Sequence, residues 1–147
     1  EKVDTALLLF DSINHLTTLT DWEKTFKTAK ANLNKQGLFI FDFNTKSKLD
    51  FLAKQPPSFR LLQKQKVLVE LKIQKKRSIY NWIIRLYPKK GQNYLYQTRE
   101  NIQESTFSLP QVKSKLVKYF KILECFDEKY SLPNKNSKRI YIVAKVI

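Results

Sequence analysis

Apolar residues form two nearly continuous runs within the first 45 positions of the chain. The first run, Val3–Phe10, ends in the mainly polar string Asp11–His15, and the second run is Leu38–Phe43. Short apolar runs that stop at polar residues are typical of strands buried on both faces of a parallel sheet. We therefore expect two buried strands, each with polar residues at its carboxyl end.

The segment between these runs has the period of a helix. Its apolar positions recur at intervals of four, three and four residues: Trp22, Phe26, Ala29 and Leu33. Thr20–Glu23 has the spacing of a capping box and predicts the helix start. Gly37 predicts a left-handed helix end. Strand, helix and strand together predict a right-handed βαβ unit.

The middle of the chain changes to a period of two. Residues with strand character lie at 67–74, 78–87 and 93–105, after a short helical segment that ends at Pro56. Pro88–Gly91 has the composition of a turn. We expect an antiparallel β meander over residues 58–106.

The last third returns to a helix and then to strands. Ser108 and Gln111 have the spacing of a capping box, and the helix stripe that follows is Val112, Leu116 and Phe120. Lys121–Phe126 and Arg139–Ile147 predict a closing pair of antiparallel strands. The full pattern predicts an α/β fold and a single domain over residues 1–147.

Composition excludes several classes of protein. The chain has 147 residues, of which 42% are hydrophobic, and no apolar stretch is long enough for a membrane span. We expect a soluble, cytoplasmic protein. With one Cys and one His no zinc cluster can form, so no metal site is expected and Cys125 should be a buried packing residue. The chain begins at Glu1 and contains no Met, so we expect a fragment or a processed chain.

The charge balance is strongly basic. Lys and Arg number 28 and Asp and Glu number 13, which gives a net charge of +15 and favours polyanions. One interpretation is a nucleic-acid-binding sheet face with basic residues near two aromatic rings: Lys64, Lys66, Lys72, Lys75, Lys76 and Arg77, with Tyr80 and Trp82. The other is a solvated basic surface, because the lysines are spread along the whole chain. Both stay open at this point.

Candidate chemistry lies at the ends of the two predicted parallel strands. Ligands of open parallel sheets bind outside the carboxyl ends of the strands, where Asp11–His15 and Asp42–Thr45 supply polar side chains. We expect these two groups to lie side by side. His15 is the only imidazole in the chain and the one candidate for a general base near neutral pH. Local turn capping explains Asp11 and Asn14 equally well. For His15 a hydrogen-bonded position at a strand-to-helix turn, and for Asp42 the end of a strand, are the favoured structural explanations.

The order and spacing of these segments resemble a known enzyme family. Asp11-Ser12-Ile13-Asn14-His15-Leu16 after the first strand, and Gly37–Thr45 at the second, are similar to the fourth strand, helix and fifth strand of class I S-adenosylmethionine-dependent methyltransferases. The likeness is strongest to glycine N-methyltransferase and related small-molecule enzymes. Tyr96–Glu100 and Glu104–Leu109 look like the C-terminal end of the same enzymes. The resemblance implies a Rossmann-like fold, S-adenosylmethionine as cofactor and a small-molecule methyl acceptor.

The resemblance also implies roles for individual residues. Those expected to contact the cofactor are Leu9, Phe10, Asp11, Ser12 and His15. Those expected to face the acceptor are Asn14, Asp42 and Asn44. Methyl transfer is an in-line displacement that mainly requires alignment, so no catalytic residue is assigned.

The chain departs from the family in one respect. Such methyltransferases carry an acidic-x-Gly-x-Gly loop after their first strand, whereas this chain has only Gly37 and Gly91. We therefore expect the C-terminal part of the fold, weak cofactor binding by this chain alone, and an apolar edge at Val3–Phe10 open to another chain or a second copy. A basic nucleic-acid-binding or RNA methyltransferase module and a catalytically inactive interaction domain are the alternatives.

Overall fold

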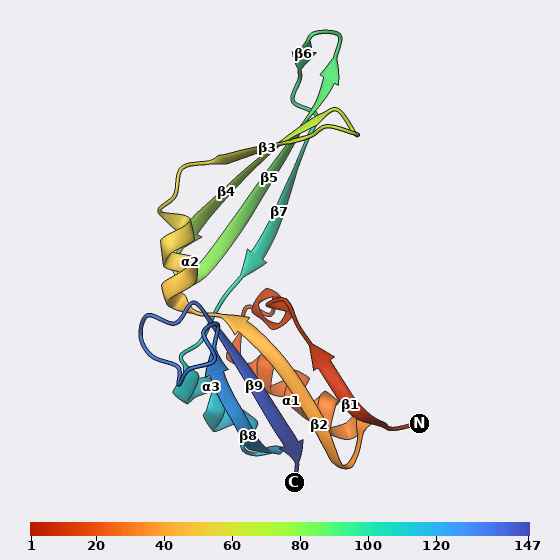
Figure 1. Cartoon of the computed structure of the whole chain (residues 1–147), viewed down its shortest axis with the longest axis vertical. Coiled ribbons are helices and arrows are strands. Elements are labelled where there is room, and N and C mark those ends of the chain that lie inside the picture. Colours follow the sequence, from red (N-terminus) through yellow and green to blue (C-terminus); the bar gives the residue numbers. More distant parts are fainter. The chain divides into compact units, whose positions relative to one another are not determined.

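The computed structural model describes residues 1–147, and their contacts fall into two units. Unit 1 comprises Glu1–Leu49 and Ser105–Ile147, and unit 2 comprises Asp50–Glu104 (Figure 1). The prediction of a single domain over residues 1–147 concerns independent folding and stays a prediction. None of the helices is long and apolar enough to cross a membrane.

Unit 1 is a four-stranded sheet with helices on one face. In sheet order its strands are β1 (Val3–Leu8), β2 (Leu33–Asn44), β9 (Arg139–Val146) and β8 (Phe120–Asp127). Its helices are the 3-10 helix η1 (Ser12–His15), α1 (Leu19–Asn32) and α3 (Leu109–Leu116). β1 and β2 pair in parallel, while β9 is antiparallel to both of its neighbours. The predicted parallel pair and closing antiparallel pair are thus confirmed.

The core of unit 1 lies between the sheet and the helices α1 and α3. Alternate residues of β2 and β9 face it in register, as the pairs Phe39 with Ala144, Phe41 with Ile142 and Phe43 with Ile140. α1 contributes Trp22 and Phe26, and α3 contributes Val112 and Leu116. All of these side chains are buried. Phe120, predicted at the end of the helix stripe, instead begins β8 and is buried there.

The prediction that the first strand is buried on both faces is wrong. β1 stands at the edge of the sheet and pairs only with β2, so Val3 is 49% exposed and Leu7 is 60% exposed. A nearly continuous apolar run cannot distinguish an edge strand from a central one, because sheet order is set by distant segments. The expected apolar edge is present, and its pairing with a second copy stays a prediction.

The predicted ends of α1 also need correction. The helix is capped by Thr18, whose hydroxyl accepts from the Asp21 N–H at 3.1 Å, two residues before the predicted cap. Gln36, with φ of 69°, takes the left-handed conformation assigned to Gly37. Gly37 is favoured for another reason. A Cβ there would lie 3.0 Å from the carbonyl oxygen of Asn34 and 3.2 Å from that of Asp4 in β1, so glycine relieves a tight contact.

Unit 2 is the antiparallel meander predicted from the sequence. Its strands are β3 (Ser58–Leu62), β4 (Val67–Lys76), β5 (Ile79–Lys90), β6 (Asn93–Tyr94) and β7 (Thr98–Glu104). β5 lies between β4 and β7, and β3 pairs with the first half of β4. The helix α2 (Lys46–Ala53) leads into this unit. Pro88 belongs to β5 rather than to the predicted turn, which instead forms at Gly91 with φ of 62°.

A buried carboxylate organises one face of the meander. Glu70 is only 7% exposed although its side chain is charged. It forms an ion pair with Arg85 at 2.6 Å and accepts a hydrogen bond from the Tyr87 hydroxyl. The bond to Glu70 raises the pKa of Tyr87, because ionising that phenol would place two negative charges together.

The two connections between the units meet inside unit 1. The Thr106 hydroxyl donates to the carbonyl of Asn44 at 2.6 Å, and the Ser105 N–H donates to the carbonyl of Asn14 at 2.8 Å. Unit 1 therefore holds the entry and the exit of the inserted segment beside each other.

Candidate functional site

The loop that follows β1 has a strained backbone. Phe10 and Asp11 are consecutive non-glycine residues with φ of 58° and 54°, in the left-handed region. Such a conformation costs about 1–2 kcal/mol per residue and persists only where neighbouring groups enforce it. Asp42, at the carboxyl end of β2, enforces it: its carboxylate accepts the Phe10 N–H at 2.9 Å and the Asp11 N–H at 2.8 Å.

Arg139 joins this loop to the sheet. Its Nη1 contacts Oδ1 of Asp42 at 2.7 Å, and its Nη2 contacts Oδ1 of Asp11 at 2.6 Å. We call Asp11, Asp42 and Arg139 the carboxylate–arginine cluster. It contains two carboxylates and one guanidinium, so it keeps one negative charge in excess. The Asp42 side chain is only 3% exposed, which strengthens its attraction to Arg139 relative to a surface pair.

Two buried asparagines complete the support of the loop. Asn14 is 0% exposed, and its amide donates to the carbonyls of Asn44 at 3.2 Å and Ser105 at 2.8 Å. In return, Asn14 Oδ1 accepts the Asn44 N–H at 2.9 Å. The Asn44 amide donates to Oδ2 of Asp11 at 2.8 Å. Every polar atom of the Asn14 side chain is therefore used to fix the loop.

The structure divides the expected site residues into two groups. Asp11, Asn14, Asp42 and Asn44 lie together in one hydrogen-bond network, as expected for neighbouring strand ends. Phe10, Ser12 and His15 are exposed on the same loop, Phe10 at 82%, while Leu9 is half-buried. The Ser12 hydroxyl donates to the carbonyl of Leu9 at 2.6 Å. The loop thus presents an exposed group of side chains, Phe10, Ser12 and His15. It is held by a second, largely buried group: Asp11, Asn14, Asp42 and Asn44.

Arg139 was not identified from the sequence. It appeared there only as the first residue of a closing strand. Its role depends on the register of β9 against β2, where Arg139 pairs with Asn44 across the strands. A basic residue at the start of a strand is a weak signal without that register.

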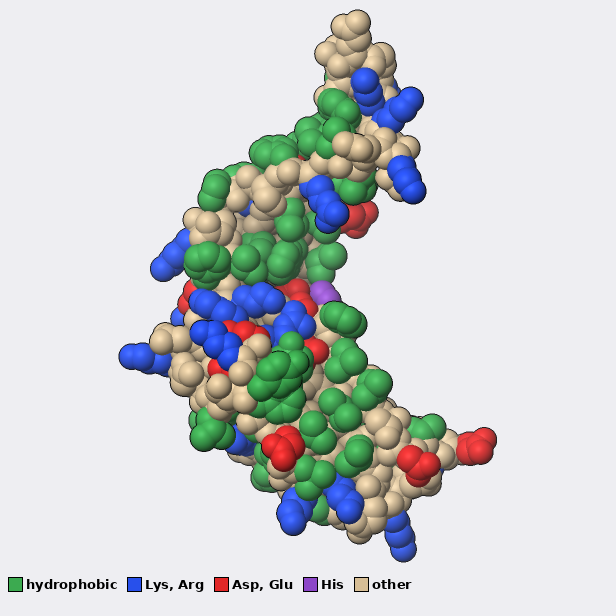
Figure 2. Space-filling view, viewed as in Figure 1, with side chains coloured by type: hydrophobic (Ala, Val, Ile, Leu, Met, Phe, Trp, Pro, Cys, Tyr) green, Lys and Arg blue, Asp and Glu red, His purple; other side chains and the backbone are tan.

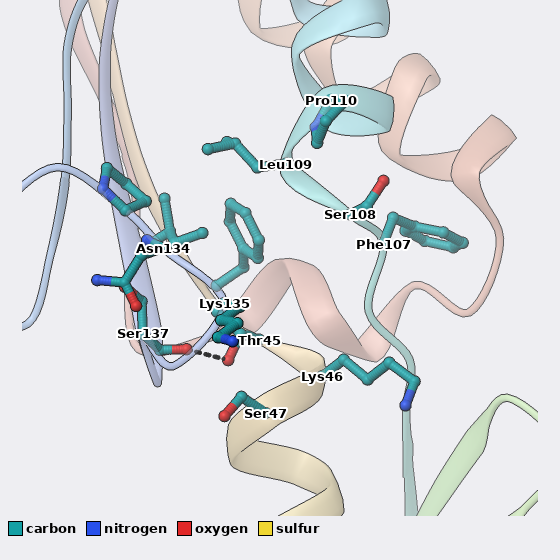
Figure 3. Close-up of a pocket in the computed structure, with 13 residues that line it drawn as sticks. Thr45, Lys46, Ser47, Phe107, Ser108, Leu109, Pro110, Asn134, Lys135 and Ser137 are labelled. Atoms are coloured by element: carbon teal, nitrogen blue, oxygen red, sulfur yellow. Dashed lines mark hydrogen bonds between the residues drawn. The ribbon is translucent and has the colours of Figure 1, made fainter.

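A cavity of about 420 Å³ opens beside the carboxyl end of β2 (Figure 3). Phe43 and Ile140 form an apolar part of its wall, and Figure 3 shows Leu109 and Asn134 on opposite sides of the space. The Thr45 hydroxyl closes one side with a hydrogen bond to the carbonyl of Ser137 at 2.6 Å. This volume and mixed lining suit a small amphipathic molecule. Thr45 comes from the polar string Asp42–Thr45, but none of the residues expected to contact the cofactor or the acceptor lines the cavity.

Asp127 shapes the loop that forms one wall of this cavity. Its carboxylate accepts the Ser137 hydroxyl at 2.8 Å, the Lys129 N–H at 2.9 Å and the Ser131 N–H at 3.1 Å. These bonds favour the ionised form, and the Ser137 bond makes the largest contribution, so the pKa of Asp127 lies below its ordinary value. The loop is therefore ordered by a charged carboxylate at neutral pH.

Several solved structures that superpose on this chain are named as methyltransferases. One from Clostridium acetobutylicum superposes with a TM-score of 0.82 at 22% identity, covering 99% of this chain and 58% of its own. An amino pentose methyltransferase from Micromonospora echinaspora, involved in calicheamicin biosynthesis and solved with S-adenosylmethionine, gives 0.74 at 11% identity, covering 99% and 59%. A sugar N-methyltransferase from Streptoalloteichus gives 0.75 at 9% identity, covering 97% and 56%.

The comparisons confirm the predicted fold. The chain has the architecture of the C-terminal part of a class I methyltransferase, and it spans less than two thirds of the length of the structures it matches. No protein-family model and no curated protein matches the sequence.

Proposed function

We propose that the chain is part of an S-adenosylmethionine-dependent methyltransferase that acts on a small molecule. The observation that carries the proposal is the strained loop at Phe10 and Asp11, fixed by Asp42 and Arg139 at the carboxyl end of a parallel strand. In open α/β sheets this is where ligands bind. The similar structures named above include methyltransferases of sugars and of an amino pentose, which supports a small-molecule acceptor.

The residues present fit one side of a cofactor site. S-adenosylmethionine supplies a methyl group on a positively charged sulfonium. In our proposal the carboxylates of Asp11 and Asp42 attract this cation, while Arg139 and Lys48, whose ammonium donates to Asn44 at 2.8 Å, offset part of their charge. The chain contains no glycine-rich loop, since Gly37 lies within β2 and Gly91 lies in a turn of unit 2. In our proposal the loop after β1 therefore forms one wall of the site.

We assign contact roles to the exposed group and positioning roles to the buried group. The side chains of Phe10, Ser12 and His15 are exposed and therefore accessible to a ligand, while a contact of the half-buried Leu9 stays a prediction. The carboxylate of Asp11 is held by Arg139 and Asn44, so it acts through its charge.

Burial favours a positioning role for the residues expected to face the acceptor: Asn14, Asp42 and Asn44. A direct contact of any of them with the acceptor stays a prediction. The exposed imidazole of His15 can take up a proton if the acceptor arrives protonated.

The nucleic-acid alternative has less support from the structure. Tyr80, one of its two expected stacking rings, is 2% exposed, and its hydroxyl donates to Asp50 at 2.7 Å. A buried ring cannot offer a face to a base. In Figure 2 basic side chains gather in one group beside Asp and Glu side chains, and the others are scattered singly over the visible surface. The cytoplasmic location stays a prediction.

Calorimetric titration with S-adenosylhomocysteine tests the proposal. We would titrate the chain and the full-length product of its gene, and we expect binding by the full-length product. Phe10→Ala in that product should weaken binding about tenfold, because the loop backbone loses the residue that shapes its exposed side. Tyr130→Ala is the matched control, since Tyr130 is 87% exposed with φ of 58° in another loop of unit 1.

The outcomes separate the enzyme class from the role of the loop. No binding of S-adenosylhomocysteine by the full-length product would overturn the methyltransferase proposal. Equal binding by the Phe10 and Tyr130 variants would leave that class standing and overturn the assignment of the loop as a cofactor wall.

A further inference from the structure

Unit 2 contains a basic cavity that the proposed methyl transfer does not use. Its volume is about 710 Å³, and it lies between the end of α2 and the second half of β4. Its lining contains one acidic residue, Asp50, and the basic residues Lys54, Lys72, Lys75 and Lys76. Ala53 and Ile73 are its only apolar lining residues, so an apolar ligand would find little complementary surface.

The cavity lies along an open strand edge. β3 pairs with β4 only from Val67 to Leu71, so the backbone of Lys72–Lys76 has a neighbouring strand on one side alone. Side chains alternate along a strand, which places Lys72 and Lys76 on one face and Lys75 on the other. Lysines from both faces therefore flank a strand edge at which alternate backbone N–H and C=O groups have no strand partner.

Most of the positive charge in the cavity is not neutralised. Asp50 forms an ion pair with Lys75 at 2.6 Å and also accepts the Tyr80 hydroxyl. The other lysines, Lys54, Lys72 and Lys76, have no acidic partner in the structure. Four lysines and one aspartate leave three positive charges in a concave space.

A neighbouring cavity extends the basic surface. It has a volume of about 580 Å³, shares Lys76 and Asn81 with the first cavity and adds Arg77 and Ser78 at the turn after β4. The amides of Gln74 and Asn81 supply further polar atoms along the first cavity. The two cavities together have room for an anion larger than a single phosphate.

We propose that this cavity binds a small molecule that carries a diphosphate or a similar pair of phosphate groups. Ammonium groups and backbone N–H donors are the partners that phosphate oxygens take up in proteins. A concave site without an exposed aromatic ring suits a compact phosphate ligand better than a nucleic-acid strand, because Tyr80 is buried. The proposal is independent of the methyl transfer proposed above, since all lining residues belong to unit 2.

The competing explanation is that the lysines protect the open edge. Lysines on edge strands prevent pairing with other chains, and that role needs no ligand. The two explanations differ in their consequences. Edge protection predicts that removing the lysines causes self-association, whereas a diphosphate site predicts loss of an anion that binds at low concentration.

Titration of inorganic pyrophosphate into the chain tests the proposal, with amide NMR shifts and calorimetry as readouts. Lys72→Gln combined with Lys76→Gln should weaken pyrophosphate binding about a hundredfold, since each of the two lost charge-assisted contacts is worth about a factor of ten. The control combines Lys89→Gln with Lys90→Gln, which removes the same charge from exposed positions at the end of β5. The control should retain the affinity of the unmodified chain.

Four results would overturn the proposal. They are the absence of pyrophosphate binding, an equal loss in both double variants, binding of single-stranded RNA without binding of pyrophosphate, and self-association of the Lys72 and Lys76 variant with unchanged affinity. The first result would mean that the cavity does not bind a diphosphate. The second would mean that binding depends only on the net positive charge of the chain. The third favours nucleic acid, and the last favours edge protection.

Discussion

Replacing Arg139 by methionine should destabilise unit 1 by about 3 kcal/mol. The guanidinium makes contacts of 2.7 Å to Asp42 and 2.6 Å to Asp11, and methionine keeps the apolar stem without the charge. The variant therefore leaves two carboxylates close together with no cation between them.

The magnitude follows from burial. Removing one partner of a buried ion pair costs about 3–5 kcal/mol, because the remaining charge is neither hydrated nor neutralised. The Asp42 side chain is 3% exposed, but it keeps its two backbone N–H donors. The Asp11 side chain is 19% exposed, so water can compensate part of its loss. These two compensations place the expected value at the low end of the range.

Urea unfolding followed by tryptophan fluorescence measures this cost in unit 1 alone. Trp22 is buried in the core of unit 1, and Trp82 lies in unit 2, so a Trp82→Phe background isolates the first signal. With a slope of about 1.5 kcal/mol per M, a loss of 3 kcal/mol lowers the midpoint by about 2 M. The slope itself should not change.

The control is Lys24→Met, which breaks an ion pair with Asp21 in which the lysine is 73% exposed. Exposed pairs of this kind contribute less than about 0.5 kcal/mol. A loss below about 1 kcal/mol for the Arg139 variant would refute the reasoning, because it would mean that water or another group replaces the guanidinium. Adding Asp11→Asn to that variant should recover part of the lost stability, since it removes one of the two uncompensated charges and keeps an oxygen that accepts the Asn44 amide.

Further predictions concern other buried groups. Asn14→Ala should lower the free energy of unfolding of unit 1 by about 2–3 kcal/mol in the same urea assay, because it leaves the Asn44 N–H and the Ser105 carbonyl without partners. A loss of stability no larger than that of Lys24→Met would contradict this prediction. Because the folded-state pKa of Asp127 lies below its ordinary value of 3.8, its stabilisation is present above that pH and is lost as the pH falls through the folded value. Asp127→Asn should therefore flatten the fall of the urea midpoint in acid, and an unchanged pH profile would count against this role. Burial raises the pKa of Cys125, so its thiol should react with a disulfide reagent more slowly in the folded chain than in urea. Equal reaction rates in the two conditions would show that the thiol is accessible in the folded chain.

Local signals made much of the fold predictable. Ser108 and Gln111 form the capping box that their spacing indicated, and Val112 and Leu116 are buried on the stripe that follows. Such patterns act within a few residues, so the sequence contains all of the information that they need. The meander was recognisable for a similar reason, since its strands are neighbours in the chain.

Non-local features were beyond the sequence. The exposure of Leu7 depends on the position of β1 at the sheet edge, and the role of Arg139 depends on a contact with a residue 97 positions away. Gly37 shows a subtler case. Its place after the helix pattern predicts a helix end, whereas in the structure a Cβ at Gly37 would crowd the carbonyl oxygens of Asn34 and Asp4. A glycine can thus mark a special position correctly, although the contact that favours glycine there involves a residue far away in the sequence.

The close entry and exit of unit 2 have a consequence for how this fold can change over time. Because Thr106 bonds to Asn44 across the insertion point, the host sheet fixes both ends of the inserted polypeptide. Adding residues to a loop whose ends are already fixed costs little entropy, since that cost rises only with the logarithm of length. Segment 50–104 can therefore be lengthened, exchanged or recombined while the register of β2 with β9 is kept. The strands of unit 1 that hold the strained loop can stay the same through such exchanges, while the sequence and length of unit 2 change.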